Sequence, residues 1–375
     1  MVPEDAATSL TPINRVAVIG VGLIGGSFGM ALLRRGVARE VSGFDVDARS
    51  LDRAVALGAI TQAARSLEAA VRGAELVIVA VPVAQVVEVT LQVLQLADPD
   101  AVVTDVASVK RPVMEAVAAC GRRAQFVGGH PMTGSERPGV DAADPYLFEN
   151  AIYLLMTAEG ENGPAISRLT RWIRAIGALP VTVDPDAHDR MVAAVSHLPH
   201  LLAAALVRAA DRVNADLPLT LSLAAGGFRD TTRIAAGDPN LWADIMLANA
   251  EPLLASAQVL ENCWHELLEA VANRDRDQLV RLLSSACEVR RSLPVRHKGY
   301  VQPFYELVVE LQDRPGAIAQ VTSILGEAGI NLADIEILRA REGFGGTLRL
   351  AVESEAARDE ALLLLAARGF TCRQR

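Results

Sequence analysis

The feature that most constrains the fold is a glycine-rich segment near the N-terminus, residues 16–27, with the sequence VAVIGVGLIGGS. Its apolar start predicts a buried strand, and the glycines after it predict a tight turn that leads into a helix. We expect Gly20 to permit the turn, Gly22 to let the backbone approach a pyrophosphate, and Gly25 to let the helix pack closely on the strand. The amides at the start of that helix would face the phosphates with the positive end of the helix dipole. The alternative is an ordinary glycine-rich turn between a strand and a helix.

A second short strand is expected at 41–45, and it ends in Asp45. A carboxylate at this distance from the glycine turn binds the ribose hydroxyls of NAD and would repel the 2′-phosphate of NADP. The two features together predict a Rossmann-type nucleotide-binding domain with NAD as its cofactor. The candidate cofactor-binding residues are Gly20, Gly22, Leu23, Ile24, Gly25, Asp45, Val81 and Pro82.

Composition and charge exclude several classes of protein. With 375 residues, 51% of them hydrophobic, the chain is globular and long enough for about two or three domains. A net charge of −9 argues against nucleic acid as a partner. The acidic N-terminus predicts no signal peptide, and no apolar run reaches the roughly 18 residues of a membrane span, so we expect a cytoplasmic protein. The cysteines show no C-x-x-C pair, which is typical of reduced thiols; they are Cys120, Cys263, Cys287 and Cys372.

The first half of the chain, 13–184, alternates short apolar runs with helical stretches, which predicts a parallel sheet covered by helices on both faces. After the first two strands we expect further strands at 75–80, 101–105, 125–128, 151–157 and 179–184.

The rest of the chain predicts two more domains. Residues 185–292 show only helical spacing, and their apolar helices exceed what one small bundle would bury, so we expect a helical domain that forms a homodimer. A basic segment at 293–302, interrupted by Pro and Gly, is predicted to be a linker. Residues 303–375 follow the order strand-helix-strand-strand-helix-strand, which is typical of a ferredoxin-like domain.

Two polar clusters follow the strands expected at 101–105 and 125–128, at the sheet edge where parallel α/β sheets bind ligands. The first contains Ser108, and its alternative role is a helix N-cap. The second, 128–136, contains His130, and its alternative is a solvated turn histidine. A neutral imidazole at this edge can accept a proton from a substrate hydroxyl while hydride leaves the same carbon. We therefore expect His130 and Ser108 to be catalytic.

Two further clusters fall in the helical domain. In the segment 196–200, Pro199 should kink the helix, and His197 and His200 share one face. No third ligand stands at metal spacing, so packing or substrate contact is the better prediction and no metal is expected. In the segment 226–235, two glycines beside Arg229 and Arg233 suggest a bend that aims a guanidinium at a carboxylate. The alternative is a surface arginine in a turn.

Taken together, these clusters resemble the prephenate dehydrogenase family, including its arogenate-using relatives. The motifs appear in the family's order across about residues 15–250: GVGLIGGS, DVASVK, GGHPMTGSE, SHLPH, GGFRDTTRIA and then DPNLW. One departure is 133–135, TGS, which keeps a hydroxyl where the family often has Thr. The C-terminal turn at 313–316 and the segment 329–331 resemble an ACT domain, a small-molecule sensor of amino-acid metabolism.

The resemblance implies an activity and a role for each candidate. Members oxidise prephenate with NAD, releasing carbon dioxide and forming 4-hydroxyphenylpyruvate on the route to tyrosine. His130 would take the proton of the ring hydroxyl, Ser108 would orient that hydroxyl, and Arg233 would bind a substrate carboxylate, with Arg229 as the competing candidate. The other residues implied at the pocket are His200 and Ser196 in its lining, Ser135 and Glu136 at its mouth, and Trp242 as support for Arg233.

The ACT resemblance implies regulation by an aromatic amino acid, with L-tyrosine as inhibitor, at Asp313, Gly316 and Asn331. Three other functions stay open at this point. Arogenate would be an alternative substrate, giving tyrosine directly. A dehydrogenase of another hydroxy acid usually relies on a lysine in the helical domain, and this chain has no lysine between Lys110 and Lys298. A sensor of NAD and amino acids without catalytic activity would not need Ser108, His130 and Arg233 together.

Overall fold

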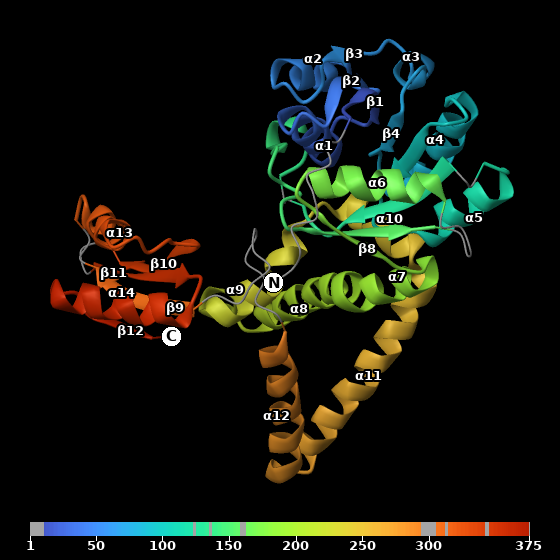
Figure 1. The fold of residues 1–375 in the computed structure, drawn as a ribbon. Helices are drawn as coiled ribbons and strands as arrows, with labels where there is room; N and C mark the ends of the chain where they lie inside the picture. The colour runs from blue at the N-terminus through green and yellow to red at the C-terminus, as the bar shows by residue number, and fades with distance from the viewer. Residues whose placement is uncertain are drawn as a thin grey trace. The chain divides into compact units, whose positions relative to one another are not determined.

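The computed structural model describes residues 11–122, 125–134, 137–157, 163–293, 305–311, 314–341 and 345–374. The chain divides into two compact units, Met1–Ser292 and Leu293–Arg375, whose helices and strands are labelled in Figure 1. The first unit contains an eight-stranded sheet in the order β3-β2-β1-β4-β5-β6-β7-β8. Its strands are β1 (Ile13–Ile19), β2 (Ala38–Phe44), β3 (Gln62–Ala63), β4 (Leu76–Val79), β5 (Val102–Asp105), β6 (Phe126–Pro131), β7 (Ile152–Met156) and β8 (Leu179–Thr182).

The sheet is not fully parallel, which corrects the prediction. β7 runs antiparallel to β6, while every other neighbouring pair is parallel. A parallel crossover needs a long connection, usually a helix. The segment between β6 and β7 contains only the short 3-10 turn η2 (Val140–Ala142) among its described residues, so the chain reverses there. The two-residue strand β3 was also not predicted, because it is exposed and too short to show a period.

Helices cover both faces of this sheet and enclose two apolar cores. Residues of β1 alternate between the cores, with Val16 and Val18 in one and Ala17 and Ile19 in the other, as expected for the two-residue period of a strand. The first core is completed by α1 (Leu23–Arg34), α2 (Ala48–Ala56) and α6 (Pro164–Ala175). The second is completed by α3 (Leu67–Val71), α4 (Val83–Leu96) and α5 (Arg111–Ala119).

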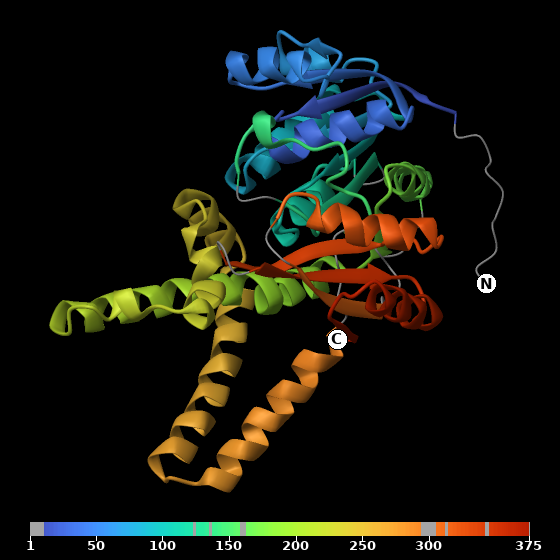
Figure 2. The ribbon, with the colours of Figure 1, turned by 90° about the vertical axis from the view of Figure 1, so that its left-hand side faces the viewer.

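The rest of the first unit is helical, as predicted. It comprises α7 (Pro185–Val192), η3 (Ala193–His197), α8 (Leu198–Asp216), η4 (Leu221–Leu223), α9 (Gly226–Thr232), η5 (Arg233–Ala236), α10 (Pro239–Ala248), α11 (Ala250–Ala272) and α12 (Arg276–Ser292). Figure 1 and Figure 2 show α11 and α12 extending away from the sheet as a hairpin. Within the described residues, none of the side chains of α12 is buried.

Helices α7, η3 and α8 form one helical segment, Pro185–Asp216. Its middle turn, η3, is a π-helix that ends two residues before Pro199. A proline lacks the amide that the preceding turn needs, and the wider turn accommodates that loss. By length and composition alone this segment could cross a membrane, with a mean hydropathy of 1.4 in its most apolar window. It also carries the buried polar residues His188, Asp189, His197 and His200.

The second unit has the predicted ferredoxin-like order. Its elements are β9 (Tyr305–Leu311), α13 (Ala317–Glu327), β10 (Asp334–Arg341), β11 (Gly345–Val352), α14 (Glu355–Ala367) and β12 (Cys372–Gln374). The four strands pair in the order β10-β11-β9-β12, all antiparallel. Both helices pack on one face of this sheet around an apolar core that includes Leu307, Val321, Leu350 and Leu365.

Candidate active site

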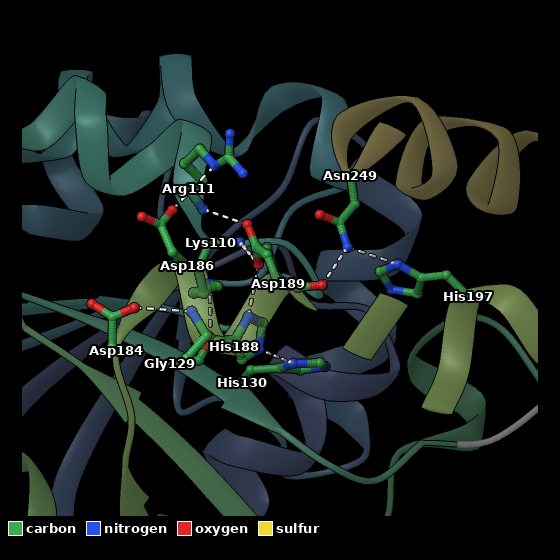
Figure 3. Close-up of polar contacts among 12 residues, drawn as sticks. Lys110, Arg111, Gly129, His130, Asp184, Asp186, His188, Asp189, His197 and Asn249 are labelled. Carbon is green, nitrogen blue, oxygen red and sulfur yellow. Dashed lines mark hydrogen bonds and ion pairs between the residues drawn. The ribbon is translucent and has the colours of Figure 1, made fainter. Parts of the chain in front are cut away.

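A chain of three polar side chains starts at His130 and ends at Asp189 (Figure 3). Nδ1 of His130 lies 2.8 Å from Nε2 of His188. Nδ1 of His188 lies 2.7 Å from Oδ1 of Asp189. His188 and Asp189 are both buried on α7, and His130 is partly exposed on β6. His130 therefore presents one end of this chain toward the carboxyl edge of the sheet.

The chain determines which nitrogen of His130 is a base. An ionised carboxylate only accepts hydrogen bonds, so the proton of His188 must be on Nδ1, where it faces Asp189. A neutral His188 then has a lone pair on Nε2 and accepts the Nδ1 proton of His130. The remaining nitrogen of His130, Nε2, is left with a free lone pair. This is the tautomer that general base catalysis at Nε2 requires.

The surroundings keep His130 neutral. Its pKa is held well below the usual range by burial first, and then by the nearby His188, Lys110 and His197. The pKa of Asp189 is lowered: burial would raise it, but the hydrogen bonds from His188 and from the amides of Arg111 and Lys110 outweigh that effect. The site thus combines an ionised acid with a neutral imidazole over a wide pH range.

A buried ion pair fixes the backbone beside His130. Nζ of Lys110 contacts Oδ2 of Asp105 and donates to the carbonyl of Gly129 at 2.9 Å. Oδ1 of Asp105 accepts from the amide of Gly129 at 3.2 Å. Both backbone groups of Gly129 are therefore bound, and a side chain at this position would meet the Asp105 carbonyl at 2.5 Å. The ion pair holds the strand that carries His130 in one place.

Asp189, the last of the three side chains, is hydrogen-bonded to the start of α5. The amides of Lys110 and Arg111 each donate to a carboxylate oxygen of Asp189 at 2.8 Å. The side chain of Arg111 also pairs with Asp186 at 3.2 Å and with Glu251 at 2.7 Å. These contacts join the nucleotide-binding sheet to the helical segment, so the polar chain crosses between the two parts of the unit.

A second group of side chains lies around Trp242 on α10. His200 stacks on its ring with the centroids 3.7 Å apart, and His197 meets it edge-on at 6.3 Å. Nδ1 of His197 lies 3.1 Å from Nδ2 of Asn249. His200 is buried, and its Nδ1 has no hydrogen-bond partner among the described residues. A buried ring nitrogen of this kind is suited to bind a polar group of a ligand.

The glycine turn is tight at Gly20 and open at Gly22. Gly20 has a φ of +90°, and a Cβ there would lie 2.4 Å from the carbonyl oxygen of Ala80. A Cβ on Gly22 would meet nothing within 4 Å, and this residue precedes α1 without a side-chain cap. The first amides of α1 are therefore available to phosphate oxygens. Oδ2 of Asp45 accepts from the amide of Val21 at 2.9 Å, so the carboxylate also braces the turn.

The catalytic candidates from the sequence lie on neighbouring strands, with one correction. His130 is inside β6 and not after it, because β7 continues to pair with β6 beyond the end of β5. Ser108 follows β5 and is not a helix N-cap, since α5 begins at Arg111 with Lys110 before it. The part of the chain that the structure describes shows no hydrogen bond to the Ser108 hydroxyl. The hydroxyl of Ser108 is therefore available to orient a ligand at this edge.

The substrate-binding candidates are only partly brought together. Ser196 lies in the π turn η3, one residue before His197. Arg229 and Arg233 are exposed on α9 and η5, and Nε of Arg229 donates locally to the carbonyl of Ala224 at 3.1 Å. The turn after η5 lies against the second group, since a Cβ on Gly237 would approach Trp242 Nε1 at 2.8 Å and His200 at 3.3 Å. Ser135 and Glu136 lie outside the described residues.

The regulatory candidates are also partly covered. Gly316 has a φ of +85° and precedes α13, and Nδ2 of Asn331 donates to Glu353 at 2.7 Å. Asp313 and most of the predicted linker lie outside the described residues.

The sequence did not identify His188, Asp189 and Asn249 as site residues. A signal for the first two was present, because they come shortly after 179–184, the last strand predicted for this sheet. Asn249 gave no such signal, since an asparagine between two helices is an ordinary junction residue.

Comparison with known proteins identifies the family. Residues 28–181 match the nucleotide-binding domain of prephenate dehydrogenase, and residues 184–285 match its dimerization domain. Residues 305–368 match the ACT domain. A prephenate dehydrogenase of Bacillus subtilis is 35% identical over 357 residues, which cover 95% of this chain and 96% of the relative. The chain belongs to the prephenate dehydrogenase family.

Solved structures of this family have the same fold. The prephenate dehydrogenase of Aquifex aeolicus, in complex with hydroxyphenyl propionate and NAD+, has a TM-score of 0.71 and 30% identity, covering 76% of this chain and 99% of its own. The arogenate dehydrogenase of Synechocystis has a TM-score of 0.67 and 30% identity, covering 75% of this chain and 100% of its own. The Rossmann, helical and ACT architecture expected from the sequence is thereby confirmed.

Proposed function

We propose that this chain catalyses the NAD-dependent oxidative decarboxylation of prephenate to 4-hydroxyphenylpyruvate in tyrosine biosynthesis. The observation that carries the proposal is the chain from His130 through His188 to Asp189, which leaves a lone pair on Nε2 of a neutral imidazole. His130 lies at the sheet edge where the glycine turn and Asp45 fit NAD. Bound NAD⁺ accepts a hydride in this chemistry.

The residues of the protein then have the following roles. Ser108 orients the ring hydroxyl of the substrate, and Nε2 of His130 takes the hydroxyl proton as hydride leaves the same carbon. The carboxylate at the opposite ring position departs as carbon dioxide, and its bonding electrons complete the aromatic ring. His130 returns the proton to the phenolate oxygen. His188 and Asp189 stabilise the imidazolium that forms in between, as an oriented carboxylate does for a catalytic histidine.

The substrate is held by the helical part. We assign a substrate carboxylate to Arg233, with Arg229 as the competing residue. His200 and Ser196 line the pocket, and Ser135 and Glu136 lie at its mouth. The stacking of His200 on Trp242 supports this assignment, because it holds a buried ring with an unpartnered Nδ1 in one orientation.

The domain limits that we propose are 13–184 for NAD, 185–292 for substrate and dimerisation, and 303–375 for regulation, with 293–302 as linker. The match to a dimerization domain and the exposed apolar side chains of α11 and α12 support a homodimer. We place the enzyme in the cytoplasm and expect L-tyrosine to inhibit it through the ACT domain. Asp313, Gly316 and Asn331 are the residues that we expect to bind it.

One assay tests the activity directly. NADH formation should be measured at saturating NAD⁺ with prephenate, with arogenate and with a panel of small hydroxy acids. We expect the highest kcat/KM with prephenate. Arogenate is the second candidate because of the likeness to the Synechocystis enzyme, and a higher kcat/KM with arogenate would reassign the substrate. Turnover of a hydroxy acid alone, or of none of these compounds, would overturn the proposal.

A further inference from the structure

Asn249 lies where the two groups of site side chains meet. It ends α10 and precedes α11, and it is 2% exposed. Its Nδ2 donates to the backbone carbonyl of Asp189 at 2.8 Å and faces Nδ1 of His197 at 3.1 Å. Figure 3 shows this amide between the two residues. The side chain of Asn249 therefore contacts both α7, the helix that carries His188 and Asp189, and the group of side chains around Trp242.

These two contacts determine the protonation of His197. A carbonyl oxygen only accepts, so the amide must present its NH₂ group and not its oxygen on this side. The second hydrogen of that group then points at Nδ1 of His197, which must carry a lone pair. His197 is thus neutral, with its proton on Nε2. An asparagine is suited to this task because its amide nitrogen donates twice and never accepts.

The contact between Asn249 and His197 also fixes the group of side chains around Trp242. His197 packs edge-on against Trp242, and Trp242 stacks on His200. The space around Trp242 is tight, because a Cβ on Gly237 would come within 2.8 Å of its Nε1. A displaced His197 would therefore move Trp242, and with it the ring of His200. Since this packing is close, small shifts at Asn249 are transmitted to the pocket.

We propose that Asn249 is a positioning residue that holds His197 in its neutral form. It thereby couples the hydrogen-bonded side chains His130, His188 and Asp189 to the group of side chains around Trp242. The proposal rests on the proposed function for its kinetic consequences. It does not rest on that function for the protonation of His197, which can be measured without substrate.

The charges around His197 show why its neutrality matters. Around it are His188 and Asp189 on α7, His130 on β6, and His200 on α8, which contacts the same Trp242 ring, while Glu251 on α11 pairs with Arg111. Burial lowers the pKa of His197 to about 4, and Asp189 opposes this shift while His188 adds to it. A protonated His197 would place a positive charge beside His130 and make that base weaker.

The deciding variant is Asn249→Asp. A carboxylate at this place would accept a proton from His197 and stabilise its charged form, so the pKa of His197 rises. If it rises to about 7, only about a tenth of His197 is neutral at pH 6, and kcat falls about tenfold between pH 8 and pH 6. The wild-type enzyme should show a flat kcat over this range. Asn273→Asp, the same change at an exposed position after α11, should also stay flat.

Two controls separate this role from a merely structural one. In the double variant Asn249→Asp/His197→Phe no imidazole can be protonated at that place, so the loss of kcat at pH 6 should disappear. Nitrogen NMR of the wild-type protein, assigned through His197→Phe, should show a neutral ring with its proton on Nε2 at pH 6. The NMR arm needs neither the Asn249→Asp variant nor turnover, so it stays decisive if Asn249→Asp does not fold or prephenate is not the substrate.

Two results would overturn the inference. One is a wild-type His197 that titrates at or above pH 6.5. The other is a loss of kcat at pH 6 that persists in the double variant.

Discussion

At the scale of single residues, the site is a set of polar groups whose hydrogen bonds leave few choices of protonation. Asp189 orients His188, and His188 orients His130, so a lone pair is available at only one nitrogen of His130. The ion pair of Lys110 and Asp105 fixes the neighbouring backbone from the other side. Burial raises the pKa of Tyr153, next to this pair, and keeps its phenol neutral. Asp105 is thus paired with Lys110, while Asp189 is held by hydrogen bonds from His188 and from two backbone amides.

The first prediction concerns the base. We expect His130→Asn to lower kcat by about 10²–10⁴-fold, the usual contribution of a positioned general base. The amide of asparagine can still donate to His188, so the fold and the affinity for NAD should be retained. Steady-state kinetics and calorimetric titration with NAD measure the two effects separately. A variant with turnover within a few-fold of wild type would show that His130 is not the base.

The second prediction concerns the cofactor. In Asp45→Ser/Val46→Arg, the serine keeps an oxygen for the amide of Val21, and the arginine takes a position that is 93% exposed. Removing the carboxylate and adding a positive charge should shift the preference from NAD toward NADP. The ratio of kcat/KM for the two cofactors is the measurement. Val46→Arg alone keeps Asp45 and should retain the preference for NAD. A wild-type enzyme that already prefers NADP would contradict the assignment.

At the scale of elements, irregular turns place several of the candidate site residues. The π turn η3 presents Ser196 and His197 and ends two residues before Pro199, and the short helix η5 begins with Arg233. π-type turns are frequent at functional sites because they turn side chains out of the regular helical spacing. Gly237 ends η5, and Asp238 caps α10 by accepting from the amide of Asn240. The breaks expected from glycine and proline in this region are therefore where the structure has them.

The third prediction compares the two arginines of this region. Arg233→Ala should weaken prephenate by about 2 kcal/mol, or about 30-fold in KM, as expected when a carboxylate loses a charged hydrogen-bond partner. The affinity for NAD should be unchanged. Arg229→Ala is the matched control, because Nε of Arg229 donates to the carbonyl of Ala224 in the same helical region. The assignment is reversed if Arg229→Ala raises KM more than Arg233→Ala does.

The fourth prediction concerns the hairpin of α11 and α12. Its exposed apolar side chains are Leu254, Val259, Trp264, Leu268, Val271, Val280, Leu283 and Val289. Exposed apolar surface of this extent marks a protein interface. We expect Leu283→Glu to convert the dimer to a monomer, measured as mass by light scattering. Ser285→Glu adds the same charge on the helix face of Arg281 and Glu288 and should leave the dimer intact. A wild-type protein that is already monomeric would refute the dimer.

At the scale of the whole molecule, the candidate active site and the ACT domain are in separate compact units, Met1–Ser292 and Leu293–Arg375. The second unit has its own apolar core between one sheet and two helices. A unit with a complete core can fold by itself. A ligand that binds it changes the activity of the first unit only if it prefers one conformation of the enzyme, with a differential affinity of about 1–3 kcal/mol.

The fifth prediction concerns this second unit. Deletion of residues 303–375 should leave a folded, active enzyme that L-tyrosine inhibits more weakly. Residual competitive inhibition is expected, since tyrosine resembles the product. Inhibition curves and calorimetric titration of the intact enzyme measure the effect. If the deletion abolishes both activity and the dimer, and the intact enzyme binds no amino acid, the unit has a structural role only.

Much of this molecule could be predicted from local patterns. The glycine turn, the order of strands and helices and the ferredoxin-like end follow from periodicity and turn chemistry, which depend on residues near each other in the chain. His130 and Ser108 were predicted to be catalytic because polar residues after parallel strands meet at one sheet edge. Only the tertiary structure decided that β7 reverses, because strand direction depends on the connection across the sheet and not on the strand's own residues.

The partners of the site were also decided only by the tertiary structure. His188 is 58 residues from His130, and Asn249 is 60 residues from Asp189. Contacts of this kind depend on how α7 and α10 pack against the sheet, and no spacing in the sequence encodes that packing. The sequence by itself therefore determined the family of folds and the sheet edge of the candidate site. The packing decided which nitrogen of His130 keeps a lone pair and which side chains orient that ring.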